Sequence, residues 1–225
     1  GSDQVGWDMK ARAGRKKVVL ELGGNAAVLI EPDTNIDAAL DRLVAGSFGH
    51  SGQVCISVQR IVAHAVIYDE LKTKFVARVA KLIPANPQLE STVVGPMIKH
   101  KEAERLKQWI DAAVAKGANL LCGGELNGAM LQATVLENVP DGCDVIENEA
   151  FGPVVVLQQY QSFREGLDLI NQSRFGLQAG VYTQNINQMF EAWDTLHVGG
   201  VIINDVPTFR VDNMPYGGVK DSGLG

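Results

Sequence analysis

Apolar and polar positions along the chain divide it into short strands and amphipathic helices. Ala26 to Ile30 and Val154 to Tyr160 are apolar runs of the length expected for strands. From Ile36 to Phe48, apolar side chains such as Leu40 and Leu43 recur on one face of a helix. This pattern predicts two strands and a helix that packs one face against a core.

The same pattern predicts strands and helices that alternate over most of the chain. Ser162 and Glu165 match a capping box, in which each side chain satisfies a free amide at the start of a helix. Further helices are expected at about 4–14, 67–82, 99–116, 162–171 and 185–196, and further strands at 17–22, 60–65, 120–122, 133–136, 179–182 and 200–203. We therefore expect an α/β fold whose mostly parallel, twisted sheet is flanked by helices.

Composition and charge exclude several functions for the 225-residue chain. Lys and Arg total 20 against 26 Asp and Glu, a net charge of −6, and no basic patch suggests a nucleic acid or an anionic membrane as partner. The apolar runs are far shorter than the roughly 18 residues of a membrane span, and the polar start has no signal-peptide core. We expect a cytoplasmic protein.

Cysteines and histidines form no metal-binding pattern. The 3 cysteines lie far apart without a C-x-x-C pair, and the 4 histidines do not cluster. We therefore expect reduced thiols and no metal site. His50 precedes Cys55 closely enough to admit a Cys-His hydrolase, although sequence spacing says nothing about geometry.

Two side chains beside glycines are candidates for acyl chemistry. Cys55 follows a Ser51-Gly52 turn that could expose a thiol and leave amides free to face an oxyanion. Glu21 ends a predicted strand just before Gly23 and Gly24, where a carboxylate could activate water to release a thioester. From the local pattern alone, a small buried cysteine and an ordinary carboxylate at a strand end remain alternatives.

Two further segments carry polar side chains at turns. Glu149 and Phe151 precede Pro153, so a carboxylate that could hold a ribose hydroxyl lies beside an aromatic ring that could face a flat group. Asn204 ends an apolar strand. An acidic loop with a core phenylalanine, and a turn asparagine, are the alternatives.

Five motifs together resemble the aldehyde dehydrogenase superfamily in order and approximate spacing. They are Glu21-Leu22-Gly23-Gly24-Asn25, Gly52-Gln53-Val54-Cys55, Glu149-Ala-Phe-Gly-Pro153, Asn204, and Pro215-Tyr-Gly-Gly218 to Ser222-Gly223. The resemblance covers nearly the whole chain. It implies that the Cys55 thiolate attacks an aldehyde, that a nicotinamide cofactor accepts hydride, and that Glu21 activates the water that hydrolyses the thioester.

The resemblance also implies cofactor contacts. Glu149 matches the ligand of the nicotinamide ribose and Phe151 the ring contact, while Leu22 and Gly23 lie near the carboxamide. Ser2 resembles a residue at the start of a helix beside the pyrophosphate, where free amides favour an anion. If Gly1 and Ser2 were left over from cloning, the assignment of Ser2 to the pyrophosphate would not hold. The cofactor is NAD or NADP.

Members of the superfamily are about twice as long as this chain, which resembles their catalytic portion. We expect a remnant of the dinucleotide-binding domain at 1–22, the catalytic thiol domain at 23–205, and a glycine-rich segment at 206–225 that leads back toward the cofactor domain. The upstream half, which holds most of the dinucleotide-binding sheet, has no counterpart here. The choice between NAD and NADP therefore stays open.

The resemblance bears on substrate and assembly as well. The presence of Glu21 fits the acid-forming type rather than members that transfer the acyl group to coenzyme A. The segment from Thr208 to Pro215 resembles members acting on small polar or anionic aldehydes, where Arg210 could contact an anion, unless it only pairs with Asp212. Asn204 would lie near the substrate end of the tunnel, and the parent would form a homodimer or homotetramer.

Two functions from other classes stay open at this point. A catalytically silent interaction or oligomerisation fragment would self-associate without activity. A cofactor-independent thiol esterase would turn over activated esters through Cys55 and Glu21.

Overall fold

A seven-stranded sheet forms the centre of the molecule, in the order β11-β10-β2-β3-β8-β7-β4. The computed structural model describes residues 1–224. All neighbours in this sheet are parallel except β4, which pairs antiparallel with β7 at one edge. Its strands are β2 (Ala26–Ile30), β3 (Val58–His64), β4 (Asn119–Cys122), β7 (Thr134–Glu137), β8 (Val154–Tyr160), β10 (Gln178–Tyr182) and β11 (Gly200–Ile203). The expected α/β fold with a mostly parallel sheet is confirmed.

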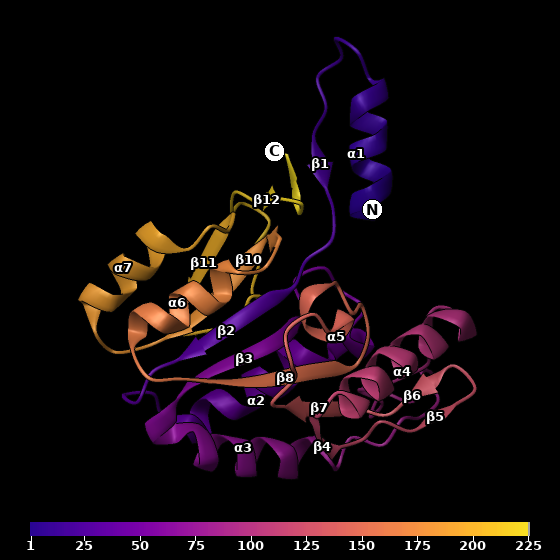
Figure 1. Cartoon of the computed structure of the whole chain (residues 1–225), viewed down its shortest axis with the longest axis vertical. Helices are drawn as coiled ribbons and strands as arrows, with labels where there is room; N and C mark the ends of the chain where they lie inside the picture. Colours follow the sequence, from indigo (N-terminus) through magenta and orange to yellow (C-terminus); the bar gives the residue numbers. More distant parts are fainter. Residues whose placement is uncertain (225) are drawn as a thin grey trace.

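Helices cover both faces of this sheet (Figure 1). They are α2 (Ile36–Phe48), α3 (Ala65–Val79), α4 (His100–Ala115), α5 (Asp144–Glu147), α6 (Phe163–Asn171) and α7 (Ile186–Thr195). One core lies between α2, α3 and the sheet, and two others lie under α4 and under α6 with α7. Leu40 and Leu43 of α2 are fully buried in the first core, where each contributes about 1.5–3 kcal/mol.

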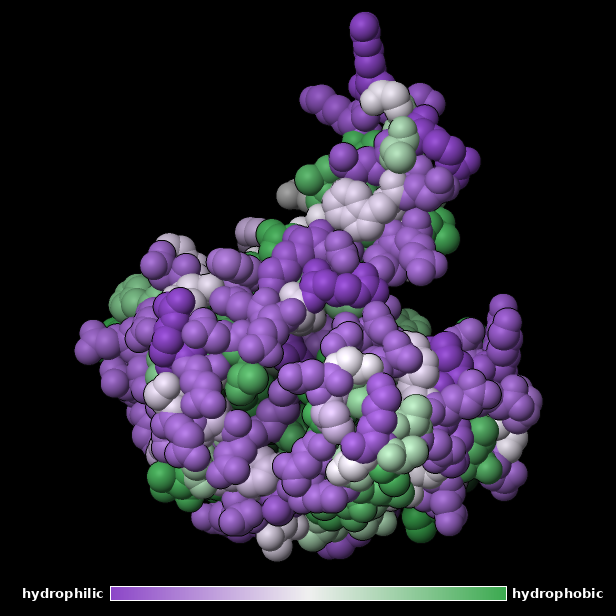
Figure 2. Space-filling model, in the orientation of Figure 1, coloured by the Kyte–Doolittle hydropathy of each residue, from purple (hydrophilic) through white to green (hydrophobic). Residues whose placement is uncertain are grey.

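Three two-stranded sheets and an N-terminal arm complete the chain. The arm comprises α1 (Asp3–Arg12) and β1 (Leu20–Glu21), and it projects from the body as a narrow extension (Figures 1 and 2). The remaining elements are β5 (Leu126–Asn127) with β6 (Met130–Leu131), β9 (Phe175–Gly176) with β12 (Val219–Lys220), β13 (Gly223–Leu224) with β1, and the short turn of helix η1 (Gly49–Gly52).

A few polar contacts hold the arm against the body. Arg174 Nη1 donates to Asp3 Oδ2 at 2.6 Å and to Asp221 Oδ2 at 2.8 Å, and its guanidinium lies 4.1 Å from the ring centroid of Phe175. The indole of Trp7 donates to the carbonyl of Asp221 at 3.3 Å. The arm is therefore anchored to the residue before β9 and to the turn between β12 and β13, and this brings its start to the main body.

Long periodic segments were predicted well and short paired strands were not. The predicted bounds of β2, α2, β8 and β11 match the structure, and Ser162 caps α6 in a capping box with Glu165. The predicted strand at 17–22 is wrong in extent, because only Leu20–Glu21 pairs and its partner β13 is equally short. Strands of two residues depend on a distant partner, so no local pattern reveals them.

Candidate active site

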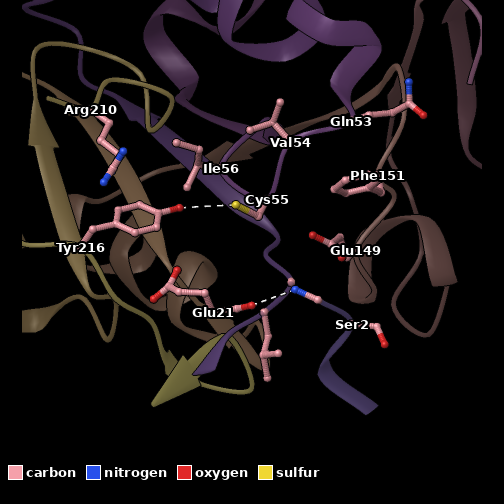
Figure 3. Close-up of a pocket in the computed structure, with 13 residues that line it drawn as sticks. Ser2, Glu21, Gln53, Val54, Cys55, Ile56, Glu149, Phe151, Arg210 and Tyr216 are labelled. Carbon is pink, nitrogen blue, oxygen red and sulfur yellow. Dashed lines mark hydrogen bonds between the residues drawn. The ribbon is translucent and has the colours of Figure 1, made fainter. Parts of the chain in front are cut away.

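A pocket of about 820 Å³ lies at the amino ends of three neighbouring strands, β2, β3 and β8. The segments that enter these strands supply most of its wall, and the return loop after β11 closes one side (Figure 3). Its lining residues are Gly1, Ser2, Glu21, Leu22, Gly23, Gln53, Val54, Cys55, Ile56, Glu149, Phe151, Arg210 and Tyr216. Parallel strands place their amino ends at one edge, so residues far apart in sequence meet there.

Cys55 lies on a turn of unusual backbone conformation that leads into β3. His50, Ser51 and Gly52 have positive φ angles of 51°, 57° and 68°. Ser51 holds this turn, because its hydroxyl accepts from the amide of Gly95 at 2.8 Å. Non-glycine residues with positive φ store strain that the surrounding structure must hold. The turn leaves Cys55 half-buried at the pocket wall.

Gly24 allows the β2 entry to approach the cysteine loop. A Cβ atom at Gly24 would lie 2.1 Å from the carbonyl oxygen of Cys55, so no side chain fits there. The amide of Gly24 donates to Glu149 Oε1 at 2.9 Å. The glycine thus joins the loops before β2, β3 and β8 into one wall.

Tyr216 and Arg210 form the opposite side of the pocket. The hydroxyl of Tyr216 lies 3.4 Å from Cys55 Sγ (Figure 3). The Arg210 guanidinium lies 4.8 Å from the centre of the Tyr216 ring, within cation-π range. Burial and the hydrogen bond with Cys55 raise the pKa of the Tyr216 hydroxyl above its usual value. Arg210 also approaches the exposed Asp212 at 3.8 Å, a separation at which an exposed ion pair adds little stability.

Glu21 presents its carboxylate to the same pocket from β1 (Figure 3). Partial burial raises the pKa of this carboxyl group, and the charge of Arg210 opposes that shift. A carboxylate with a raised pKa is a stronger base, which suits proton abstraction from water.

Glu149 and Phe151 lie across from Tyr216. Burial raises the pKa of Glu149, although its hydrogen bond from Gly24 opposes that shift. Within residues 1–224, Glu149 Oε2 accepts no hydrogen bond. Phe151 has a positive φ of 46° and its ring is 40% exposed. The site therefore offers one free carboxylate oxygen beside an exposed aromatic face.

Ser2, Leu22 and Gly23 form the part of the wall that the arm supplies. The hydroxyl of Ser2 caps α1 by accepting from Val5 N at 3.4 Å. Leu22 is buried and packs against Gly6 of α1, where a Cβ would lie 2.3 Å from Leu22 Cδ2. A Cβ at Gly23 would lie 2.6 Å from Glu149 Oε2. A side chain at position 23 would therefore displace the Glu149 carboxylate from this place.

The structure brings eight of the nine candidate residues together and leaves out one. The eight are Ser2, Glu21, Leu22, Gly23, Cys55, Glu149, Phe151 and Arg210. Asn204 does not line the pocket. It follows β11 at the carboxyl end of the sheet, and its Oδ1 accepts from Thr183 N at 3.1 Å. The expectation that Asn204 lies near the substrate is therefore corrected, because β11 ends at the opposite edge.

Tyr216 lines the pocket, although no local pattern in the sequence indicates a role for it. It stands in the Pro215-Tyr-Gly-Gly218 motif, so the signal that marks it was the motif itself. Gln53 was also missed; its Oε1 accepts from Ile98 N at 2.8 Å and steadies the loop before Cys55.

Comparison with known proteins assigns the class. The model of the aldehyde dehydrogenase family matches residues 1–225. A 3-sulfolactaldehyde dehydrogenase from Priestia aryabhattai is 44% identical over 225 residues, covering 100% of this chain and 47% of that protein. The chain belongs to the aldehyde dehydrogenase family.

Two solved structures show the same fold. Aldehyde dehydrogenase 21 from Physcomitrella patens, in complex with the reaction product succinate, has a TM-score of 0.97 at 48% identity, over 100% of this chain and 47% of that one. Glyceraldehyde-3-phosphate dehydrogenase GapN from Methanocaldococcus jannaschii, complexed with NADP, has a TM-score of 0.96 at 38% identity, over 100% and 49%. The chain thus spans about half the length of these relatives, which belong to an NAD(P)-dependent family of oxidoreductases.

Two features are absent from the described part of the chain. Within residues 1–224, no helix has the length and apolar character needed to cross a membrane. Over the same range, no group of three or more His, Cys, Asp or Glu side chains is arranged to hold a metal ion.

Proposed function

We propose that the protein carrying this chain oxidises a small aldehyde to a carboxylic acid with NAD or NADP. The observation that carries the proposal is that Cys55, Glu21 and Glu149 line one pocket of about 820 Å³. A thiol, a basic carboxylate and a carboxylate with a free oxygen are the groups that this reaction needs.

Cys55 begins the reaction as the nucleophile. Its thiolate adds to the aldehyde carbon, a C–S bond forms, and the carbonyl oxygen becomes an oxyanion. Within residues 1–224 the amides of Cys55 and Ile56 donate no hydrogen bond, so they are free to face that oxygen. When bound, NAD(P)+ accepts hydride and so makes a thioester possible.

Glu21 completes the reaction as the base. Its carboxylate takes a proton from water while the water oxygen adds to the thioester carbonyl, and the C–S bond then breaks to return the thiolate. The raised pKa of Glu21 supports this role.

The residues present fit the nicotinamide end of the cofactor. Gly23 and Glu149 form a cradle that a Cβ would fill, and Glu149 keeps one oxygen free beside the exposed Phe151 ring. Glu149 would hold ribose hydroxyls, Phe151 would face the ring, and the backbone of Leu22 and Gly23 would lie near the carboxamide. Ser2, at the start of α1, would serve the pyrophosphate.

The division of the chain follows from the same proposal. Residues 1–22 would be a remnant of the dinucleotide-binding domain, 23–205 the catalytic domain, and 206–225 a segment leading back toward the cofactor domain. The projecting arm formed by α1 and β1 supports the first boundary (Figure 1).

The assembly we propose is a homodimer or homotetramer. Ile186, Phe190 and Trp193 of α7 are each more than 60% exposed. Exposed apolar side chains along one helix are typical of surfaces that other chains cover.

The substrate we propose carries an anionic group. Arg210 lines the pocket with 43% of its side chain exposed and is only weakly engaged by Asp212. Similarity to a 3-sulfolactaldehyde dehydrogenase and to an enzyme with bound succinate supports this class. A guanidinium binds such groups through two parallel hydrogen bonds.

Reduced-nicotinamide absorbance tests both parts of the proposal. The protein is given NAD+ or NADP+ with matched anionic and neutral aldehydes. We expect a signal that Cys55→Ser abolishes, and we expect Arg210→Gln to reduce kcat/KM for the anionic aldehydes by about 10-fold or more, the loss of a charge-assisted contact.

Arg164→Gln is the matched control, because Arg164 pairs with Asp168 on the surface of α6, outside the pocket. Activity that persists in Cys55→Ser contradicts the assigned nucleophile. An unchanged preference in Arg210→Gln contradicts the anionic substrate.

A further inference from the structure

The contact between Cys55 and Tyr216 joins two loops that lie 161 positions apart in sequence. In Figure 3 the tyrosine hydroxyl points directly at the sulfur. Among the hydrogen bonds of residues 1–224, this is the one that Cys55 Sγ makes, at 3.4 Å. While both groups are neutral, either atom can be the donor.

Ionisation of the cysteine removes that ambiguity. A thiolate has no proton, so the O–H of Tyr216 must then be the donor. An ordinary tyrosine ionises at a higher pH than an ordinary thiol, and burial raises the pKa of Tyr216 further, so its hydroxyl keeps its proton while a thiol ionises. A hydrogen bond that exists in full strength only with the charged form favours that form.

We propose that Tyr216 is the hydrogen-bond donor that stabilises and positions the Cys55 thiolate. The proposal rests on the proposed function, in which Cys55 is the nucleophile. It assigns to the Pro215-Tyr-Gly-Gly218 loop a direct contact with the reacting atom.

Arg210 strengthens this donor from the other side of the ring. Its guanidinium lies 4.8 Å from the ring centroid, and a cation over an aromatic face draws electron density away from the hydroxyl. The charge of Arg210 indeed opposes the upward shift of the Tyr216 pKa. The residue proposed to contact the substrate anion therefore also acts on the thiol, through Tyr216.

The other charged groups of the pocket explain why a donor is needed. The carboxylates of Glu21 and Glu149 share the pocket with Cys55 and oppose a second negative charge there. Among the side chains of the same lining, Arg210 is the cation. Since two carboxylates share the pocket with one cationic side chain, a neutral donor at the sulfur gives the thiolate support that the net charge of these side chains does not.

The rate at which iodoacetamide alkylates Cys55 tests the proposal on the protein that carries this chain. Peptide mass spectrometry follows Cys55 separately from Cys122 and Cys143 over a range of pH. Iodoacetamide is neutral and reacts with the thiolate, so the rate reports the ionised fraction. For Tyr216→Phe we expect a rate about 3- to 10-fold lower near neutral pH, the effect of losing one hydrogen bond to a charged group.

The pH dependence separates stabilisation of the thiolate from mere access to it. Above the thiol pKa, the rates of Tyr216→Phe and the parent should converge or cross, because a less stabilised thiolate is more nucleophilic. A loss of rate that is equal at every pH would show that Tyr216 only shapes the loop, and it would overturn the proposal. An unchanged profile would overturn it as well.

Tyr182→Phe is the matched control. Within residues 1–224 the Tyr182 hydroxyl has no hydrogen-bond partner, and it lies at the end of β10 away from Cys55. We expect its alkylation profile to equal that of the parent, and circular dichroism checks that each variant is folded. If Tyr216→Phe does not fold, Arg210→Gln replaces it: a rate about 2-fold lower near neutral pH supports the proposal, and an unchanged rate overturns it.

The alkylation result stands apart from the test of the proposed function. A thiol that responds to Tyr216→Phe while Cys55→Ser keeps dehydrogenase activity would overturn the assigned nucleophile and leave the hydrogen bond in place. Dehydrogenase activity that depends on Cys55, together with a Cys55 alkylation profile that Tyr216→Phe leaves unchanged, would overturn only the inference drawn from the tyrosine.

Discussion

Polar side chains lie at both ends of the parallel strands, but their surroundings differ. We call the side where the strands end the carboxyl edge of the sheet and the side where they begin the amino edge. At the carboxyl edge, Glu31 accepts from Gln188 at 2.6 Å and contacts the hydroxyl of Tyr160, while Thr183 bonds to Asp33 at 3.1 Å. Each of these side chains has a partner within the chain. This edge is a closed network that holds the ends of the strands together.

At the amino edge the polar atoms face a pocket instead. Glu149 Oε2 accepts no hydrogen bond within residues 1–224, and the Glu21 carboxylate points into open space. Ligands of open α/β sheets usually bind beyond the carboxyl ends of the strands. Here the loops that enter β2, β3 and β8 carry the candidate chemistry, so a polar cluster marks a site only where its atoms remain free.

Replacing Cys55, the proposed nucleophile, gives the largest expected effect. Cys55→Ser should lower dehydrogenase activity on the order of 10³-fold or more, because a hydroxyl ionises far less readily than a thiol. Reduced-nicotinamide absorbance measures the loss. Cys143→Ser is the control, since Cys143 is buried in the core under α4 and should not affect the active site directly. If both variants lost the same dehydrogenase activity, the result would contradict a special role for Cys55 at the amino edge.

Replacing Glu21, the proposed base, should slow hydrolysis by about 10²- to 10⁴-fold. In the proposed mechanism Glu21 acts as a carboxylate, which protonates as pH falls through its raised pKa, so parental activity should decline in that direction. In Glu21→Gln this acid limb should disappear from the pH profile of kcat. Glu191→Gln, at an exposed position of α7, should keep the limb. If the acid limb persists in Glu21→Gln, a group other than Glu21 causes it.

Removing a hydrogen bond from the network at the carboxyl edge should lower the free energy of unfolding and leave catalysis unchanged. The hydroxyl of Tyr160 lies 3.1 Å from the carbonyl of Ile30 and also contacts Glu31. Tyr160→Phe should reduce the free energy of unfolding by about 1–3 kcal/mol, because buried acceptors lose their donor. Urea unfolding measures this, and activity per folded molecule should be unchanged. Lost activity at full stability would make the carboxyl edge a functional site.

The smallest effect is expected at Asn204. Its φ is 56° and its side chain accepts from Thr183, so Asn204→Ala should cost about 1 kcal/mol. Asn204→Gly relieves the backbone but still loses the acceptor, which separates the two contributions in thermal unfolding. KM for the aldehyde should not change in either variant. A raised KM would place Asn204 back beside the substrate.

Much of the fold followed from local pattern. The apolar spacing of α2 and the apolar runs of β2 and β8 predicted their bounds, because burial on one face or both leaves a direct trace in sequence. The predicted strand at 17–22 was wrong in extent, since its two paired residues depend on β13. Pairing between segments that are far apart leaves no such trace.

The alternation of strands and helices and the motifs around Cys55, Glu21 and Glu149 can be read from the amino-acid sequence. The contact of Tyr216 with the sulfur of Cys55, and the position of Asn204 at the other edge of the sheet, follow from the packing of the folded chain. The physical reason is that periodicity reflects which side of an element is buried. Strand order and the path of a return loop decide which loops meet, and those depend on contacts across the whole chain.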